Sequence, residues 1–317
     1  MLRVGLLGAG RIGKVHAQTI AAHPGSRLSA VSDALPEAAQ ALAGAFGASV
    51  RGTDEIVADP DIDVVLIATP TDTHSDLIEA ATAAGKPVLC EKPVDLSLAR
   101  ARACQVAAAA TGQPVMIGFN RRFDPNFSAL KAAMQADEIG KTELLSITSF
   151  DPAPPPVSYV KVSGGLFRDM MIHDFDMANF LMGGLPQTIT AQGAALVDPA
   201  IGAAGDVDTA VVTLSYADGR LAVIKNSRRA AYGYDQRVEV LGAKGLLQVR
   251  NMLENTVVRS TAEGVTGAKP TWFFLERYMS AYQAPVRWLR VAPWRWQILI
   301  HDGQGLAQLE GSMGGIV

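Results

Sequence analysis

A glutamate and a lysine end a short apolar stretch, VLCEKPV at residues 88–94. Residues 87–90 have the pattern of a buried strand, so the charged pair Glu91 and Lys92 follows at the strand's carboxyl end. Pro93 disfavours helical backbone angles at Lys92 and so restricts the direction of the ammonium group. An ammonium group fixed in this way can donate a hydrogen bond to a reacting oxygen and stabilise a developing alkoxide. The alternative interpretation is a surface ion pair in a loop.

A second polar set lies on the helical pattern at residues 167–182, where Asp169, His173 and Asp176 are spaced i, i+4, i+7. At ~100° per residue these side chains fall within about 60° of one another. Most of the rest of this helix is apolar, and buried polar groups are costly unless they are satisfied or used. His173 has the pKa range of a base, Asp169 can orient its ring, and Asp176 can hold a neighbouring hydroxyl. The alternative is a solvated polar stripe.

The combination of Lys92, Asp169 and His173 predicts oxidation of a secondary alcohol. A base removes the hydroxyl proton while a hydride leaves the carbinol carbon, and no metal is needed. One histidine and two aspartates can also bind a metal, but here they share one short helix and lack an outside ligand. We therefore expect no metal site.

A glycine pattern predicts the cofactor. Gly8, Gly10 and Gly13, with Arg11 and Ile12 between them, form G-x-G-x-x-G between an apolar strand pattern and a helical one. This arrangement places a pyrophosphate at a helix N-terminus.

Asp33 follows Gly13 by twenty residues, at the end of the second strand pattern. A carboxylate there accepts hydrogen bonds from both ribose hydroxyls and repels a 2′-phosphate, which favours NAD over NADP. The alternative is a glycine-rich turn with an unrelated surface aspartate.

A third segment is expected to border the same cofactor. Thr69 and Pro70 follow the apolar strand run at residues 64–68, and His74 begins the next helical pattern. Ligands of open α/β sheets bind at the carboxyl ends of strands, so we expect these residues, with Glu91 and Lys92, near the nicotinamide ribose. The alternative for His74 is a simple helix-start residue.

The elements that must position these residues fall into two groups. Up to about residue 119, strand and helix patterns alternate, which predicts an α/β domain with a doubly wound parallel sheet. The expected strands are residues 2–7, 27–32, 64–68, 87–90 and 114–118, and the expected helices are residues 12–22, 36–46, 75–84 and 96–110.

From residue 120 to residue 317 the pattern is that of an α+β domain. Strands follow one another with tight turns at residues 217–219 and 243–245, as in a mostly antiparallel sheet. The expected strands are residues 144–150, 209–216, 220–227, 237–241 and 246–249, and the expected helices are residues 126–136 and 167–182.

Composition narrows the class of protein. The chain has 317 residues, 49% of them apolar, and a formal net charge of −3, so nothing suggests nucleic acid as a partner. Two cysteines exclude a disulfide scaffold and suit the cytoplasm. The glycine-broken start is interpreted as part of the fold and not as a signal segment, and no apolar run reaches the roughly 18 residues of a membrane span.

Five segments resemble the Gfo/Idh/MocA oxidoreductases, and within them the inositol 2-dehydrogenases. They extend from the start of the chain to about Tyr282. The segments are GLLGAGRIGKVHA (5–17), ATPTDTHSDLIEAATAAGKPVLCEKPVDLS (68–97), GFNRRFDPNF (118–127), GGLFRDMMIHDFDMANFLMG (164–183) and EVLGAKGLLQV (239–249).

The resemblance implies a Rossmann domain and a second domain whose large open sheet mediates oligomers, commonly homotetramers. It implies NAD-dependent oxidation of a ring hydroxyl of myo-inositol, or a close isomer, to the ketone. Lys92, Asp169 and His173 would form the catalytic set. Arg121 and Asp176 would line the polyol site, and Tyr278 would approach it.

Three alternatives stay open. They are another sugar or polyol dehydrogenase of the family, a cofactor-binding homologue without turnover, and a glycosidase that uses NAD without net oxidation. One segment departs from the family pattern: residues 285–317 carry three of the four tryptophans close together. We expect this tail to be divergent or frameshifted.

Overall fold

The computed structural model describes the backbone of residues 1–288 and the side chains of residues 1–283. Beyond Trp288, the predicted atypical tail lies outside the described residues. Contacts divide the described chain into two compact units. One holds Met1–Asn120 and the segment that begins at Ala281, and the other holds Arg121–Ser280.

The first unit is built on a six-stranded parallel sheet with strand order β3-β2-β1-β4-β5-β6. This is the order of a dinucleotide-binding doubly wound sheet. The strands β2 and β3 are added on one side of β1, and β4, β5 and β6 on the other, so the strand order reverses between β1 and β4. The expected α/β fold of this part is therefore confirmed. The strands are β1 (Leu2–Leu7), β2 (Ser26–Ser32), β3 (Ser49–Val50), β4 (Val64–Ile67), β5 (Val88–Cys90) and β6 (Val115–Ile117).

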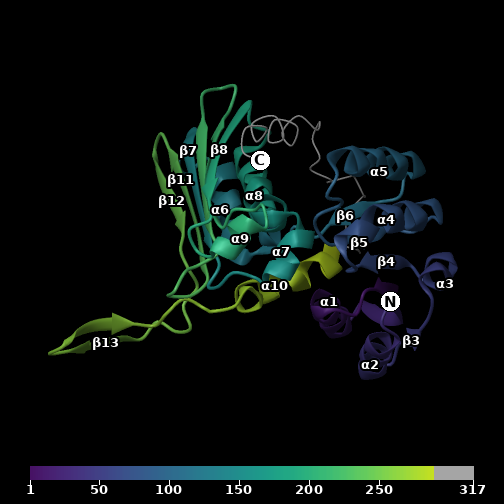
Figure 1. The fold of residues 1–317 in the computed structure, drawn as a ribbon. Coiled ribbons are helices and arrows are strands. Elements are labelled where there is room, and N and C mark those ends of the chain that lie inside the picture. The colour runs from purple at the N-terminus through teal and green to yellow at the C-terminus, as the bar shows by residue number, and fades with distance from the viewer. Residues whose placement is uncertain (289–317) are drawn as a thin grey trace. The chain divides into compact units, whose positions relative to one another are not determined.

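Helices cover both faces of this sheet, as Figure 1 shows. Helices α1 and α2 bury Ile20 and Leu42 on one face, and α4 and α5 bury Ile78 and Ala108 on the other. The two-residue β3 and the short α3 were not expected from the sequence, because neither is long enough to show a period. The helices are α1 (Arg11–Ala22), α2 (Pro36–Phe46), α3 (Thr53–Ala58), η1 (Thr71–Thr73), α4 (His74–Ala83) and α5 (Leu98–Thr111).

The second unit contains a six-stranded sheet with strand order β12-β11-β7-β10-β9-β8. Every neighbouring pair is antiparallel except β10 and β7, which run parallel. The predicted mostly antiparallel sheet is therefore confirmed. The strands are β7 (Thr142–Phe150), β8 (Thr188–Ala194), β9 (Thr209–Ser215), β10 (Leu221–Ser227), β11 (Asp235–Gly242) and β12 (Gly245–Val249).

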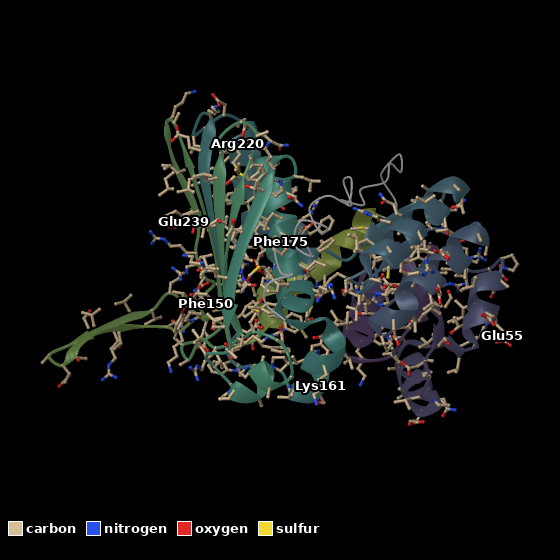
Figure 2. All side chains as sticks on the ribbon, turned by 45° about the horizontal axis from the view of Figure 1, so that its top comes forward. Glu55, Phe150, Lys161, Phe175, Arg220 and Glu239 are labelled. Atoms are coloured by element: carbon tan, nitrogen blue, oxygen red, sulfur yellow. The ribbon has the colours of Figure 1, made fainter. Side chains whose placement is uncertain are left out.

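Helices α6 and α8 lie on one face of this sheet (Figure 1). In Figure 2, Phe175 of α8 lies on the helical side and Glu239 of β11 on the other side. The remaining elements are η2 (Asn120–Phe123), α6 (Pro125–Gln135), α7 (Val157–Ser163), η3 (Leu166–Met171), α8 (Ile172–Met182), α9 (Pro199–Ala203), the hairpin of β13 (Val258–Thr261) and β14 (Gly264–Gly267), and α10 (Phe274–Trp288).

The expectation of one regular helix over residues 167–182 was wrong in its first turns. Leu166–Met171 forms a π-helical segment, η3, and the regular α8 begins only at Ile172. The segment starts directly after Gly164 and Gly165, whose φ angles of 86° and 74° suit glycine. A π-helical segment has a wider turn than an α-helix, so the angles computed from ~100° per residue do not hold across Asp169 and His173.

The helices of residues 1–288 include none that is both long enough and apolar enough to cross a membrane.

Candidate functional site

The three glycines of the loop between β1 and α1 have different surroundings. A Cβ on Gly8, whose φ is 102°, would lie 2.4 Å from the carbonyl oxygen of Ala68, and one on Gly13 would lie 2.1 Å from that of Gly8. Both glycines therefore permit close packing within the protein. Gly10 is exposed, and a Cβ there would meet nothing within 4 Å. The open side of the loop thus lies at the N-terminus of α1, where a pyrophosphate would bind, and the residues present fit a dinucleotide.

Asp33 follows β2 and contacts the glycine loop directly. Its Oδ2 accepts a hydrogen bond from the backbone N–H of Ala9 at 2.6 Å, and its Oδ1 accepts one from Leu35 at 2.8 Å. A carboxylate offers about four lone-pair sites, so both oxygens keep acceptor capacity for ribose hydroxyls. The carboxylate would therefore hold the loop as well as the ribose. Sequence reasoning identified only the second role.

Glu91 is engaged by a histidine that sequence reasoning missed. His16 on α1 is 3% exposed, and its Nε2 lies 2.7 Å from Oε1 of Glu91. A Cβ on Gly118 would lie 3.1 Å from the Glu91 carboxyl carbon, so glycine gives this carboxylate its room. The pair ties the middle of α1 to the end of β5. Direct binding of the cofactor by Glu91 stays a prediction.

Lys92 lies just beyond the end of β5, at the carboxyl edge of the sheet. The pairing of β4 with β5 ends at Ile67 and Cys90, and the Glu91 N–H then donates to the Ile67 carbonyl at 2.9 Å. The Lys92–Pro93 peptide is cis, and the lysine is partly buried. The expected placement at a strand end is therefore observed, and the catalytic role of Lys92 stays a prediction.

His74 is more than a helix-start residue. It is 1% exposed, with Nδ1 2.7 Å from the Pro93 carbonyl oxygen and Nε2 2.9 Å from the Thr69 carbonyl oxygen. Thr69 also contacts Thr73 through their hydroxyls at 2.7 Å. The predicted cofactor-border residues of this segment, Thr69, Pro70 and His74, therefore form one hydrogen-bonded turn.

In the second unit, Asp169 lies on η3 and His173 on the first turn of α8, and both are partly buried. Asp169 Oδ1 accepts a hydrogen bond from the Tyr159 hydroxyl at 2.9 Å, and Oδ2 accepts one from Arg228 at 3.4 Å. Arg228 is only 2% exposed, so it supplies positive charge from inside the protein. Sequence reasoning missed both partners, and the roles of Asp169 and His173 stay predictions.

Asp176 forms a bidentate ion pair with Arg122. Arg122 Nε and Nη2 donate to its two oxygens at 2.7 Å and 2.6 Å. The aspartate is 5% exposed, and burial raises the pKa of this carboxyl while Arg122 acts in the opposite direction. The buried carboxylate is therefore satisfied within the protein, and binding of a hydroxyl by Asp176 stays a prediction.

Arg121 and Tyr278, the other predicted polyol contacts, belong to a buried polar network. They are 5% and 1% exposed, and the guanidinium lies 5.7 Å from the Tyr278 ring centre. Arg121 forms an ion pair with the fully buried Asp174. The network's further members are Ser149, which accepts from Arg121 at 3.1 Å, Asn226, which donates to Asp174 at 2.9 Å, and Gln236, which accepts from Tyr278 at 3.3 Å.

Asp151, directly after β7, is a titratable residue that the sequence analysis did not single out. Burial raises the pKa of this carboxyl to about 6, and the negative charges of Asp169 and Asp174 add to the rise, while Arg228 and Arg121 oppose it. The signal available in the sequence was an aspartate that directly follows a strand, in the segment DPAPPP.

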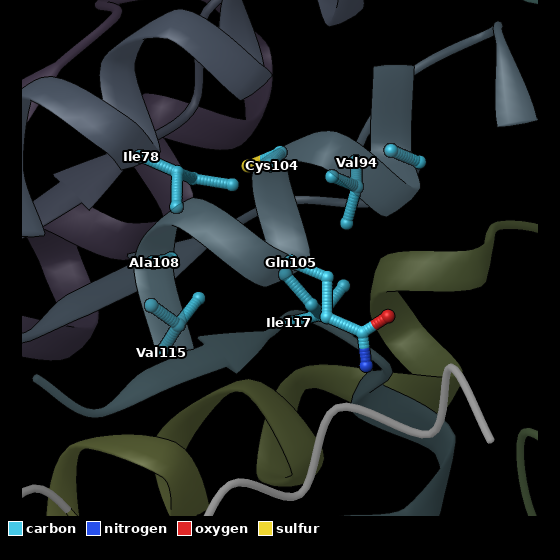
Figure 3. Close-up of a pocket in the computed structure, with 8 residues that line it drawn as sticks. Ile78, Val94, Cys104, Gln105, Ala108, Val115 and Ile117 are labelled. Atoms are coloured by element: carbon cyan, nitrogen blue, oxygen red, sulfur yellow. The ribbon is translucent and has the colours of Figure 1, made fainter. Parts of the chain in front are cut away.

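No group of three or more His, Cys, Asp or Glu side chains within the described part of the chain is placed to hold a metal ion. Figure 3 shows a small hollow beside α5. It contains no predicted site residue, and its lining is mostly apolar: Ile78, Val94, Ala101, Cys104, Gln105, Ala108, Val115 and Ile117.

Comparison with known families decides the classification. Residues 2–119 match the family described as "Oxidoreductase family, NAD-binding Rossmann fold", and residues 127–248 match the "GFO/IDH/MocA C-terminal domain". The chain belongs to the Gfo/Idh/MocA oxidoreductase family. The predicted family and the predicted cofactor, NAD, are thereby confirmed.

Relatives within the Gfo/Idh/MocA family include two proteins named for inositol. The chain is 53% identical to "Inositol 2-dehydrogenase" of Rhizobium meliloti (strain 1021) over 89% of this chain and 85% of that protein. It is 46% identical to "Myo-inositol 2-dehydrogenase" of Thermotoga maritima, over 89% and 85%.

A solved structure of the same family contains both ligands. The scyllo-inositol dehydrogenase of Lactobacillus casei, with bound cofactor NAD(H) and scyllo-inositol, superposes with a TM-score of 0.83 at 31% identity, over 90% of this chain and 86% of that one. The fold predicted from the sequence is therefore that of inositol dehydrogenase structures.

Proposed function

We propose that this oxidoreductase oxidises a ring secondary hydroxyl of myo-inositol, or of a close inositol isomer, to the ketone with NAD as oxidant. The observation that carries this proposal is the identity of 53% across 89% of the chain to a protein named inositol 2-dehydrogenase. The chain also has a lysine, an aspartate and a histidine suited to the oxidation of a secondary alcohol.

In the proposed reaction, His173 takes the proton of the substrate hydroxyl, and Asp169 orients and stabilises the imidazolium that results. Lys92 donates a hydrogen bond to the reacting oxygen and stabilises its developing negative charge. Bound NAD would supply the acceptor for the hydride that leaves the carbinol carbon. Gly10, Arg11 and Ile12 would hold its phosphates, with further contacts from Asp33, Thr69 and Pro70.

Substrate recognition is proposed for Asp176, Arg121 and Tyr278. The Asp176 carboxylate keeps acceptor capacity beside Arg122, because each oxygen carries two lone pairs. Arg121 and Tyr278 belong to a buried polar network, so their proposed contribution is to fix the wall of the polyol site. We assign residues 1–119 to cofactor binding, and residues 120–317 to substrate binding and oligomerisation.

We further propose that the enzyme is a homo-oligomer, commonly a tetramer in this family, that assembles through the open face of the second sheet. Leu246, Leu241, Leu144 and Leu221 are paired in sequence across β12, β11, β7 and β10. They are 50%, 41%, 40% and 50% exposed. A continuous row of half-exposed leucines is typical of a surface that another protein covers.

The cell compartment proposed for this enzyme is the cytoplasm. Cys90 and Cys104 are both free and buried, as suits a reducing compartment. The net charge of −3 gives no support for nucleic acid as a partner.

The experiment that tests the proposed function is a panel of inositol isomers, aldoses and other polyols, each with NAD and with NADP, followed by absorbance of the reduced cofactor. We expect turnover of myo-inositol or a close isomer with NAD. Turnover of an aldose with negligible rates on all inositols would identify another dehydrogenase of the family. Cofactor binding without any turnover would indicate a non-catalytic homologue, and release of free sugar without net reduction would indicate a glycosidase.

A further inference from the structure

The His74 ring lies between two backbone carbonyl oxygens, and this limits the protonation states that suit it. Both ring nitrogens lie at hydrogen-bond distance from backbone carbonyl oxygens, 2.7 Å for Nδ1 to Pro93 and 2.9 Å for Nε2 to Thr69. A carbonyl oxygen only accepts hydrogen bonds, and a neutral imidazole carries one N–H. Both contacts are therefore hydrogen bonds only if both nitrogens carry a proton. In a neutral ring, one contact would set two lone pairs against each other.

We propose that His74 is held as an imidazolium and acts as a positioning residue that joins the Lys92–Pro93 segment to the end of β4. The significance of the two joined segments rests on the function proposed for Lys92 and Thr69. His74 itself touches backbone carbonyls, so it is assigned no catalytic step.

The position of the two acceptors supports this role. Strand pairing between β4 and β5 ends at Ile67 and Cys90, and Thr69 and Pro93 both lie beyond that point. The imidazolium connects the two chain segments across the gap that the sheet leaves. At 1% exposure the ring is shielded from bulk solvent, which leaves the two carbonyl oxygens as the partners that the structure shows for its nitrogens.

A neighbouring residue anchors the same segment. Ser75 Oγ lies 3.2 Å from the Val94 carbonyl oxygen and 3.0 Å from Asp95 Oδ2. The first turn of α4 therefore contacts Pro93, Val94 and Asp95 in succession. A clamp of this kind would fix the backbone that carries the Lys92 side chain.

The first test is nuclear magnetic resonance of the full chain with ¹⁵N-labelled histidine, assigned by comparison with His74→Asn. We expect both ring nitrogens of His74 to show the shifts of protonated nitrogens at the pH of the activity assay. A signal from an unprotonated His74 nitrogen would overturn the proposal. This measurement needs no substrate, so it tests the proposal for His74 even if inositol proves not to be the substrate.

The second test separates the two hydrogen bonds. Asn places its amide N–H near the position of Nδ1, and Gln places its N–H near that of Nε2. His74→Asn should keep the bond to Pro93 and raise the KM for NAD, with kcat within about threefold of wild type. His74→Gln should release the Pro93 segment and lower kcat by about 10–100-fold, in the range expected for small misplacements of a reacting group.

The control for both variants is His23→Gln, outside this segment, which should leave both kinetic constants unchanged. Equal effects of the Asn and Gln variants on KM and kcat would overturn the proposed division of roles. Thermal denaturation of each variant shows whether it folds. If one does not, the other supplies the assignment of the His74 signals, and the resonance experiment on the wild-type chain decides the proposal.

Discussion

At the scale of single residues, Asp33 and Glu91 each have a structural partner in addition to the role proposed for them. Asp33 supports the glycine loop through Ala9 and would also bind a ribose, and Glu91 binds His16 beside Lys92. Such partners cannot be seen in the sequence, because each is distant along the chain. They also affect what a substitution at these positions does.

Asp33→Ser is expected to shift preference from NAD toward NADP, because the repulsion of a 2′-phosphate is removed. Loss of the bond to Ala9 should also loosen the glycine loop, so efficiency with NAD should fall by about 10–100-fold, as for a hydrogen bond to a charged group. The measurement is kcat/KM with each cofactor. The exposed Asp54→Ser on α3 is the control, and an unchanged NAD-to-NADP ratio in Asp33→Ser would contradict the assignment.

His173→Ala and Lys92→Ala are each expected to lower kcat by about 10²–10⁴-fold, the usual effect of losing an acid–base partner. Binding of NAD, measured by fluorescence titration, should change little, because neither side chain is proposed to contribute most of the cofactor affinity. Lys161→Ala on the exposed side of α7 is the control. A large loss of NAD affinity with normal kcat would remove these residues from the chemistry.

At the scale of elements, buried ion pairs hold the segment after β6 to α8. Arg122 on η2 binds Asp176, and the adjacent Arg121 binds Asp174. Two consecutive arginines thus meet two aspartates on one helix. This pairing orients α8, and with it His173.

Arg122→Gln is expected to destabilise the protein by about 3–5 kcal/mol, because Asp176 is left buried without its cation. The measurement is the free energy of unfolding from urea denaturation. Adding Asp176→Asn to this variant should recover part of the loss, since a neutral amide is cheaper to bury. Strictly additive losses in the double variant would show that the two side chains do not stabilise each other.

Asp151 at the end of β7 predicts a pH dependence of stability. Burial raises its pKa from 3.8 to about 6, so the folded state binds the proton more tightly than the unfolded chain. The free energy of unfolding therefore falls as pH rises from about 4 to about 6, by on the order of 2 kcal/mol for this group. Asp151→Asn should show a smaller fall over this window, and Asp54→Asn should match wild type. Equal slopes for Asp151→Asn and wild type would contradict the raised pKa.

At the scale of the whole molecule, the open face of the second sheet determines assembly in our proposal. Leu144→Lys combined with Leu241→Lys places two charges in the leucine row and should reduce the oligomer mass by at least half, measured by light scattering after size exclusion. The control is Val106→Lys on α5, which replaces an apolar residue that is 71% exposed. An unchanged mass in the double variant would place the interface elsewhere.

Much of the fold was predictable because the patterns involved are local. The apolar run of β4 and the glycine loop after β1 identify a parallel sheet without any knowledge of distant contacts. The second sheet was harder to predict in full. Its edge strand β8 is polar and exposed, so it has no clear apolar alternation in the sequence. The π-helical η3 gave no signal, because a spacing of polar residues does not reveal which hydrogen-bond pattern the backbone adopts.

The sequence by itself was enough to recognise the family and to predict its chemistry from three patterns: a glycine loop followed by Asp33, a lysine at a strand end, and a histidine between aspartates. These are short-range patterns, and short-range sterics and periodicity fix them. Only the tertiary structure decided which partners satisfy the charged groups, as with Arg122 on Asp176, His16 on Glu91 and the two carbonyls on His74. The physical reason is that burial leaves each polar group to find a partner in space, and residues far apart in the chain supply it.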